Sequence, residues 1–559
     1  MGATLMSCIG IKMFLATATR TARRLATVAV LLLLATNGTF AGSATWKTNP
    51  NSGNWNRVGN WIPQTIPNGP SDTATFAIST TSSVFLSANT TLNGISFDTG
   101  GDSFTFTVAP PSNSGFLALE FDGFGITNNS GSPQNFVTAA NGTIVFKGQA
   151  TADDASFTNT NNGAVQGRGE DGATLFTEFS TAGNASFTNH GGVAYQSFQG
   201  LTEFSGSSTA GNATFINNGS EVSQAPPGFT AFFDTASADN ARIVNHGGTF
   251  SGANGGLTFF DSSSSTFGPT AGNATLIACA GQNGGGPGAI QFYNNSEGGT
   301  ARVELFGDGN LDIGEDSNRT VTLGSIEGDG NIFLGSRNLA IGGNNQSTEF
   351  SGVIQDGGIR RHAVGGSLTK IGIGKLVLSH RNTYTGGTIV KRGKLVVNNV
   401  GGSGTGSGPV QVERGILSGK GIIEGAVIMG TGFGAGAFLA PGYVHGAGRP
   451  GALTSQGLLT FNGDGVYQMQ VNSSSAIADE VAAFGVAINV GAKFIFADIG
   501  NNTLSVGTVF TIINNTSATP IAGTFSNLHD QSNFSSNGNT YQVSYEGGDG
   551  NDLTLTVVP

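Results

Sequence analysis

The strongest constraint on the fold of this chain is a short phrase that recurs between residues 152 and 299. It reads Ala-Asp-Asp-Ala-Ser-Phe-Thr-Asn at 152–159, Ala-Gly-Asn-Ala-Ser-Phe-Thr-Asn at 182–189 and Ala-Gly-Asn-Ala-Thr-Phe-Ile-Asn at 210–217, with weaker copies from Ala238 and Ala271. The alanine that opens each apolar run falls at positions 155, 185, 213, 241, 274 and 301, so the spacings are 30, 28, 28, 33 and 27 residues. A near-constant period of this length indicates a repeat architecture.

Each repeat contains two short runs that favour strands. One is the Ala-Ser-Phe-Thr-Asn run, and the other is an aromatic run before the next copy, as at 174–178 and 229–233. β-Branched and aromatic residues in approximate alternation favour strands, and the Asn/Gly clusters between them favour turns. One unit cannot bury its own apolar face, whereas stacked units bury it continuously. We therefore predict an all-β fold, a parallel β-helix with about 4.8 Å between coils.

Known β-helices lead us to expect a right-handed coil, and an antiparallel sandwich array is the alternative fold. The composition agrees with a β-helix, because 39 of the 49 aromatic residues are phenylalanine. Phenylalanine has no polar atom to satisfy and suits a dry interior. Charged residues make up only 11% of the chain, yet 38% are apolar and lie in periodic runs. Disordered chains generally lack such runs, so we expect a packed core.

The N-terminus has the pattern of a secretory signal peptide. Four basic residues and no acidic residue lie in the first 41 positions, an apolar stretch occupies 25–35, and Thr39 and Ala41 supply the small residues of a cleavage site. The apolar stretch is too short to read as a membrane span. We expect cleavage near Ala41 and no membrane span in the mature chain. Translation begins at one of three methionines, Met1, Met6 or Met13.

Removal of the signal peptide leaves Cys279 as the single cysteine, so no disulfide forms within the mature chain. It also leaves 20 basic against 35 acidic side chains, a net charge of −15. A chain this acidic is not a general polyanion binder, which argues against nucleic acid as a partner. Cys279 ends an apolar run, and we expect it to be a buried, inert thiol.

The mature chain divides by composition into four regions that follow the signal peptide. All three tryptophans lie in the first region, Phe repeats occupy the second, and the coils turn aliphatic in the third. The predicted regions are a signal peptide at 1–41, an N-terminal cap with the first coils at 42–150, a Phe/Gly/Asn-rich β-helix at 151–310, an aliphatic β-helix at 311–400 and a β-rich C-terminal region at 401–559.

The sharpest motif lies between residues 368 and 397. It contains Gly372-x-Gly-x-Leu-x-Leu-Ser379, then Asn-Thr-Tyr-Thr-Gly-Gly-Thr at 382–388, then Gly393-x-Leu-x-Val397. We read it as three strands with glycine turns, and expect the Asn382–Gly387 segment to be a tight turn. The motif resembles the autotransporter-associated β-strand repeat, which occurs in the exported passenger regions of autotransporters. The C-terminal part of the chain and the tryptophan-rich opening section resemble such passenger regions more loosely.

The resemblance implies a bacterial β-helix that is exported and then displayed or released outside the cell. Classical autotransporters end in a membrane β-barrel of roughly 250 residues or more, built from about ten-residue alternating strands. Only about 160 residues follow the motif here, and they lack that pattern. We therefore expect this sequence to contain no such barrel.

Residue patterns for catalysis or metal binding are weak in this sequence. The six histidines are far apart, and His190 and His246 occupy equivalent repeat positions where another copy has Asn218, so we interpret them as turn residues. No metal-spaced Cys/His cluster, nucleophile elbow or P-loop pattern occurs. We expect no cofactor and no metal. The segment 547–552 resembles a calcium-binding nonapeptide, but a single copy with the wrong apolar spacing favours a hairpin turn.

The two adjacent acid pairs do not form a catalytic site by themselves. They are Asp153-Asp154 and Asp479-Glu480. Neighbouring residues on a strand point to opposite faces, so we expect the members of each pair to be separated.

Two groups of residues are candidates for binding. Trp46, Trp55 and Trp61 form either the core of an N-terminal cap, which we favour, or a platform on which sugar rings stack. Eight of the 20 mature basic residues lie between 360 and 394, where no acid occurs between Asp356 and Glu413. Within this stretch, we select four residues as a hypothetical site for an acidic polysaccharide or a lipid headgroup, namely Arg360, Arg361, Arg392 and Lys394. Ordinary solvated loops are the alternative.

The sequence as a whole predicts a secreted or cell-surface β-helical protein of structural or adhesive function, without catalytic activity. It would act through weak lateral contacts multiplied along a rod, with a cell-surface or matrix polysaccharide as the expected partner. The alternatives are a polysaccharide lyase or glycoside hydrolase built on a β-helix, and a carbohydrate-binding surface protein. Fold alone does not choose among them.

Overall fold

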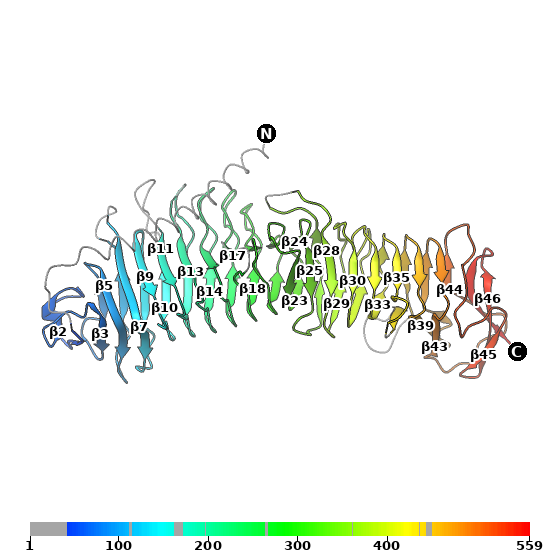
Figure 1. Ribbon diagram of the computed structural model, residues 1–559, viewed down its shortest axis with the longest axis horizontal. Helices are drawn as coiled ribbons and strands as arrows, with labels where there is room; N and C mark the ends of the chain where they lie inside the picture. Colours follow the sequence, from blue (N-terminus) through cyan, green and yellow to red (C-terminus); the bar gives the residue numbers. More distant parts are fainter. Residues whose placement is uncertain are drawn as a thin grey trace.

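The computed structural model describes residues 42–110, 115–160, 171–195, 197–262, 267–359, 362–434, 436–442 and 450–559. The predicted signal peptide lies outside these residues. The described chain is a long rod of stacked coils, with the N-terminal coils at one end and the C-terminal strands at the other (Figure 1). Apart from one 3₁₀ turn, η1 (Val58–Asn60), all its named elements are strands. The predicted all-β, parallel β-helix fold is therefore confirmed.

The first face of the rod is a ladder of fourteen strands, in which the parallel pairing begins between β1 and β3. Its strands are β2 (Trp61–Ile62), β1 (Ala44–Trp46), β3 (Gly69–Phe76), β5 (Thr90–Phe97), β7 (Leu117–Asn128), β9 (Gly142–Phe146), β11 (Gly172–Phe176), β13 (Gly200–Phe204), β15 (Phe229–Phe233), β17 (Leu257–Asp261), β19 (Ala289–Phe292), β21 (Asn310–Asp312), β24 (Asn331–Phe333) and β27 (Val353–Gln355).

The second face runs almost the full length of the rod as one parallel ladder. Its strands are β4 (Ser83–Phe85), β6 (Thr105–Val108), β8 (Asn135–Thr138), β10 (Ser156–Asn159), β12 (Ser186–Asn189), β14 (Thr214–Asn217), β16 (Arg242–Asn245), β18 (Thr275–Ala278), β20 (Arg302–Leu305), β23 (Ser325–Gly328), β26 (Thr348–Phe350), β29 (Lys375–Leu378), β31 (Lys394–Val397), β33 (Gly415–Gly419), β36 (Ala437–Pro441), β39 (Gly465–Asn472) and β43 (Lys493–Asp498). A short strand, β40 (Ile477–Ala478), pairs antiparallel with the end of β39.

A third face becomes a regular sheet only in the C-terminal half. Its strands are β22 (Thr320–Leu323), β25 (Asn338–Ile341), β28 (Ser367–Lys370), β30 (Thr388–Val390), β32 (Val410–Val412), β35 (Val427–Met429), β38 (Leu459–Phe461) and β42 (Val486–Ile488). In the Phe repeats, single bridges such as Thr181–Thr209 take the place of this sheet. The repeats therefore have two strands per coil, and the aliphatic coils have up to three.

A separate sheet closes the C-terminal end. Its strands are β34 (Ile422–Ile423), β37 (Ala452–Ser455), β41 (Glu480–Ala483), β44 (Val509–Asn515), β47 (Asp552–Val558), β46 (Asn539–Gly547) and β45 (Asn533–Ser536). Pairing is parallel as far as β44 and antiparallel among the last strands. The segment 547–552 is the turn of the β46–β47 hairpin, with the N–H of Gly550 donating to the carbonyl of Gly547 at 2.8 Å. This is the hairpin turn that the sequence favours there.

Repeat-equivalent residues stack directly on one another. Ser156, Ser186 and Thr214 are in register, as are Phe157, Phe187 and Phe215 on the inward side. Two files of phenylalanine rings fill the interior, with neighbouring centroids 4.7–5.2 Å apart. The first-face file is Phe121, Phe146, Phe176, Phe204, Phe232, Phe260 and Phe292, and the second-face file is Phe106, Phe136, Phe157, Phe187 and Phe215.

A buried ladder of asparagine side chains runs beside the phenylalanine files. The Nδ2 group of Asn189 donates to Oδ1 of Asn217 at 2.9 Å, and Asn217 repeats the bond to Asn245 at 2.8 Å. A threonine of the first face adds a second donor, as Thr230 does to Oδ1 of Asn217 at 2.8 Å. These amides are fully buried, and their hydrogen bonds offset the cost of removing them from water.

The three tryptophans form the core of the N-terminal cap. Trp46 is 2% exposed and Trp55 and Trp61 are 0% exposed, and Trp61 contacts both other rings with centroids 5.0 and 4.8 Å away. The indole N–H groups of Trp55 and Trp61 donate to the carbonyls of Pro67 and Trp55. A ring with no free face cannot stack on a sugar, so the alternative of a carbohydrate platform at these residues is wrong.

Candidate ligand-binding groove

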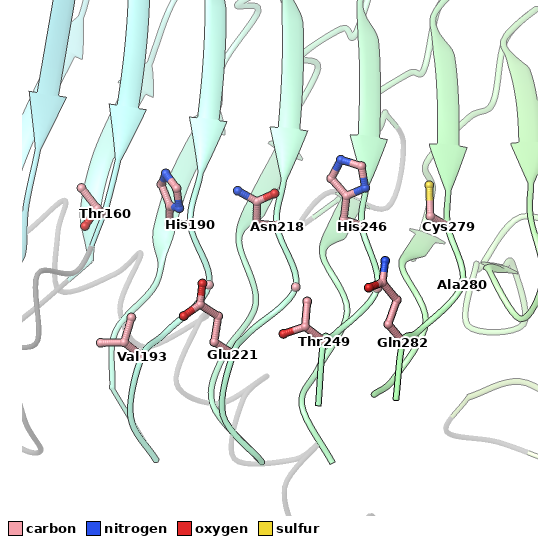
Figure 2. A pocket seen from close by; sticks show the side chains of 13 residues that line it. Thr160, His190, Val193, Asn218, Glu221, His246, Thr249, Cys279, Ala280 and Gln282 are labelled. Carbon is pink, nitrogen blue, oxygen red and sulfur yellow. The ribbon is translucent and has the colours of Figure 1, made fainter. Parts of the chain in front are cut away.

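Four side chains form a row where the second-face strands of the repeats end. His190, Asn218, His246 and Cys279 immediately follow β12, β14, β16 and β18. Each backbone N–H donates to the coil below: His190 to Asn159 at 3.0 Å, and Asn218, His246 and Cys279 to Asn189, Asn217 and Asn245, each at 2.9 Å. These bonds continue the ladder by one residue, so the four side chains share one edge of the rod (Figure 2).

A second row lies three residues further along each coil and faces the first across a groove. Its members are Val193, Glu221, Thr249 and Gln282. In Figure 2 the Glu221 and Gln282 side chains point toward the first row. The groove has a volume of about 520 Å³. It crosses five coils, from Thr160 to Cys279, which at about 4.8 Å per coil is about 19 Å.

The floor of the groove is bare backbone, since the residues between the two rows include Gly191, Gly219 and Gly247. A Cβ atom on Gly219 would lie 2.3 Å from the carbonyl oxygen of Gly247, and one on Gly247 would lie 2.1 Å from that of Ala280. The coils therefore approach too closely here for side chains, and glycine keeps the floor open.

The polar side chains of the groove have unused hydrogen-bonding capacity. Within the described part of the chain, the side chains of His190, Asn218, His246, Glu221 and Gln282 form no hydrogen bond. The hydroxyl oxygen of Thr249 is buried and also has no partner. Asn217, one residue before Asn218, is by contrast bonded on both sides. The arrangement therefore offers donors and acceptors to a ligand along one edge of the rod.

The charge of the groove is low. Glu221 is the one carboxylate among the described lining residues, and no lysine or arginine lines the groove.

Cys279 is half-buried and lies at the end of the first row, rather than fully inside the core as its sequence context suggested. Burial raises the pKa of its thiol, and the nearby Arg242 acts in the opposite direction. In the described ranges, no group of three His, Cys, Asp or Glu residues is arranged to hold a metal ion.

The acid pairs singled out in the sequence do not form a site. Asp153 and Asp154 lie in a turn rather than on a strand, so the argument from alternating faces does not apply, and both carboxylates accept hydrogen bonds from Asn128. Asp479 is buried and accepts from the backbone N–H groups of Gly451 and Gln470 at 3.0 and 2.9 Å. Burial raises its pKa to about 7.

A second buried carboxylate, Asp316, has a similar environment. It accepts from the Ser296 hydroxyl at 2.8 Å and from the N–H of Asn318 at 2.6 Å. Desolvation raises the pKa of Asp316 to about 7, although its hydrogen bonds act in the opposite direction. The buried position of Asp316 makes it a structural group that fixes the turn after β21.

The basic residues selected from the sequence fall into two groups. Arg360 and Arg361 lie outside the described residues. Arg392 is exposed, and Lys394 is half-buried on β31, where it stands in register with Lys375 on β29. Burial, with the adjacent Lys375 as a second cause, lowers the pKa of Lys394 to about 8. The polyanion hypothesis for these residues stays a prediction.

The conspicuous motif at 368–397 builds one coil and the start of the next. Asn382 connects three coils, because its Oδ1 accepts from the N–H of Ile354 at 2.7 Å and its Nδ2 donates to Gly404 at 2.7 Å. Tyr384 is fully buried with its hydroxyl 2.6 Å from that of Thr388. The Asn-Thr-Tyr segment thus continues the first face between β27 and β34, and is more than the tight turn predicted for it.

Residues 368–397 match the family model of the passenger-associated-transport-repeat. This match agrees with the resemblance of the motif to autotransporter passenger repeats. The passenger repeat indicates a β-helical protein of autotransporter passenger type, and its family suggests a location outside the cell or on its surface. No curated protein matches the chain. Across the described residues, none of the helical segments has the length and apolar character needed to span a bilayer.

The repeat pattern identifies the equivalent positions of the first row, but nothing in the sequence shows that they line a groove. His190, Asn218 and His246 occupy equivalent positions, each directly after the asparagine that ends the repeated phrase. Cys279 follows Ala278 at the corresponding position. This shared position is the feature of the sequence that points to the row. A parallel ladder places such residues in one row and turns them outward, because neighbours on a strand point to opposite sides. The second row shows no shared residue type, so nothing in the sequence links Val193 to Glu221, Thr249 and Gln282.

Proposed function

We propose that this protein is an extracellular structural and adhesive rod without catalytic activity, which holds its contact surfaces away from the cell. The observation that supports this most directly is the unbroken second-face ladder from β4 to β43, with a tryptophan cap at one end and antiparallel strands at the other. A solenoid of this kind keeps a fixed length, and its repeated lateral contacts add along the rod.

Cell fractionation followed by an adhesion assay tests the proposal. We expect the native protein in the surface or medium fraction, and we expect beads coated with the purified protein to adhere to cells or matrix. Retention inside the cell, or coated beads that adhere no better than beads carrying an unrelated acidic protein, would contradict it.

Incubation with a panel of polysaccharides tests the absence of catalysis. We expect no new reducing ends and no unsaturated products after prolonged incubation. The appearance of either product would identify the protein as a hydrolase or a lyase instead.

The acidic-polysaccharide contact is a separate part of the proposal. Changing Arg360, Arg361, Arg392 and Lys394 to glutamine should weaken salt-sensitive binding to an acidic polysaccharide such as polygalacturonate. Binding that is unchanged in this variant would remove these four residues from the interface.

A further inference from the structure

The groove formed by His190, Asn218, His246 and Cys279 on one side and Glu221, Thr249 and Gln282 on the other is, we infer, a binding site for an extended, uncharged polysaccharide chain lying along the rod axis. This inference rests on the proposed adhesive function and names a ligand class for one surface of the rod.

The spacing of the groove selects a class of polymer. A linear ligand that makes the same contact on every coil needs a unit length close to the coil rise of about 4.8 Å. An extended peptide advances only about 3.3 Å per residue and falls out of step within a few coils. One sugar ring linked through opposite sides spans about one coil. The groove crosses five coils, from Thr160 to Cys279, and accommodates about four sugar units.

The chemistry of the lining agrees with a ligand rich in hydroxyl groups. Imidazole, amide and carboxylate groups combine donors and acceptors, and sugar hydroxyls both donate and accept. The side chains of His190, Asn218, His246, Glu221 and Gln282 are free of hydrogen bonds among the described residues. They therefore bind a ligand without first breaking a bond inside the protein.

The charge of the lining argues against an acidic ligand here. Glu221 contributes a negative charge, and no described lining residue is a lysine or an arginine. A polyanion would bring its charges toward this carboxylate without a fixed cation to balance them. We therefore expect uncharged polysaccharides in the groove, and acidic ones at the distant basic residues.

Titration calorimetry with defined oligosaccharides tests the inference. The probes are β-1,4-glucan, xylan and galactomannan fragments of two to six units, with oligogalacturonate as the acidic counterpart. We expect at least one uncharged series to bind, with affinity rising up to about four units and then levelling. No binding of any uncharged fragment, or binding of the acidic series alone, would overturn the inference.

Three variants locate the binding. The double change Asn218→Ala with His246→Ala should weaken binding at least tenfold. Val193→Arg, at a rim position that is 49% exposed, should weaken it by obstructing the groove without removing a hydrogen bond from the protein. Asn212→Ala is the control, because it removes an exposed amide two residues before β14, outside the groove, and should change affinity less than twofold. The two hydrogen bonds that it removes, to Asn184 and Asn240, are both exposed.

The results separate this inference from the broader proposal. If the groove variants fold, as judged by an unchanged thermal unfolding midpoint, and bind as well as the unaltered protein, the groove is not the site. If the oligosaccharides bind in the groove but the coated beads do not adhere, the groove inference stands and the adhesive function fails. If Val193→Arg folds and binds normally while the double variant is unstable, the inference also fails.

Discussion

Two adjacent asparagines show how the direction of one side chain decides its role. Asn217 points into the rod, where it accepts from Thr230 and bonds to Asn189 and Asn245 in the buried ladder. Asn218 points out into the groove and forms no side-chain hydrogen bond among the described residues. The same residue type therefore holds the coils together at one position and faces solvent at the next.

Changing each of the two asparagines to alanine should affect stability to very different degrees. Asn217→Ala removes the acceptor of the Thr230 hydroxyl and one acceptor of the buried Nδ2 group of Asn189, which keeps its bond to the Phe229 carbonyl. Each hydrogen lost from the ladder without a replacement acceptor should cost about 1–3 kcal/mol. Asn218→Ala should change the free energy of unfolding by about 0.5 kcal/mol or less. Urea denaturation followed by circular dichroism measures both. Equal effects of the two changes would contradict the assigned roles.

A buried carboxylate makes stability depend on pH. Since the folded pKa of Asp316 is raised to about 7 by burial, the folded protein binds the proton more tightly than the unfolded chain. This contribution is complete below about pH 4 and is lost as the pH rises through about 7. The urea midpoint should therefore fall between about pH 5 and pH 8.

Asp316→Asn isolates this contribution, because the amide resembles the protonated acid in shape and charge. The variant should show a flatter dependence of the urea midpoint on pH than the unaltered protein. Asp122→Asn, at an exposed position, serves as the control and should leave the slope unchanged. A slope that is the same in Asp316→Asn and in the unaltered protein would show that another group dominates.

Phenylalanine rings of successive coils stack on one another and stabilise the strands of the repeats. Phe204 lies between Phe176 and Phe232, with centroids 4.7 and 4.8 Å away and nearly parallel rings, and meets Phe215 edge-on at 5.8 Å. Each ring is thus covered by the coil above and the coil below. This interior was predictable from the sequence, because the period and the excess of phenylalanine both indicate one file of rings per face.

Removal of one ring from a file should destabilise the repeats strongly. Phe204→Ala opens a cavity that neighbouring coils cannot close, and we expect a loss of about 3–5 kcal/mol. Phe179→Ala, in the turn after β11 and 70% exposed, should cost about 0.5 kcal/mol or less. Hydrogen exchange of the amides in β11, β13 and β15 measures the loss coil by coil. Unchanged protection in Phe204→Ala would contradict a stack that shares its stability between neighbours.

The groove was less predictable than the core. Its first row follows from the repeat, because residues after each second-face strand must align in a parallel ladder. Its second row depends on turns, and the coils differ in length, as the spacing of 33 residues between Ala241 and Ala274 shows. The course of such turns is set by local backbone packing, as at Gly219 and Gly247, which the sequence alone does not specify.

At the scale of the whole molecule, the ladder defines a length. The second face stacks seventeen strands from β4 to β43, which at about 4.8 Å per step gives about 80 Å before the caps are added. The repeat predicted this shape, since stacking coils of roughly 30 residues buries their apolar sides continuously. The antiparallel pairing of β1 with β2 was not predicted, because these strands lie outside the repeats. At the other end the sequence favours the turn of the β46–β47 hairpin, but it does not specify the antiparallel sheet around that turn.

Small-angle X-ray scattering of the mature chain tests the rod. We expect a maximum dimension of at least about 80 Å and a radius of gyration clearly above about 24 Å, the value for a compact protein of this length. The dimension should not change with protein concentration if the caps prevent end-to-end addition of strands. A radius near that of a sphere would rule out a stacked rod in solution.

The exact register between neighbouring repeats has a consequence for inheritance. Because β12 and β14 meet residue for residue, with serine on threonine and phenylalanine on phenylalanine, an in-frame duplication of one coil creates a copy whose upper and lower edges already match. A gene that contains such a unit can lengthen or shorten its product by one coil through unequal recombination, and the protein still folds. The length of the rod becomes a heritable trait that varies in small, fixed increments.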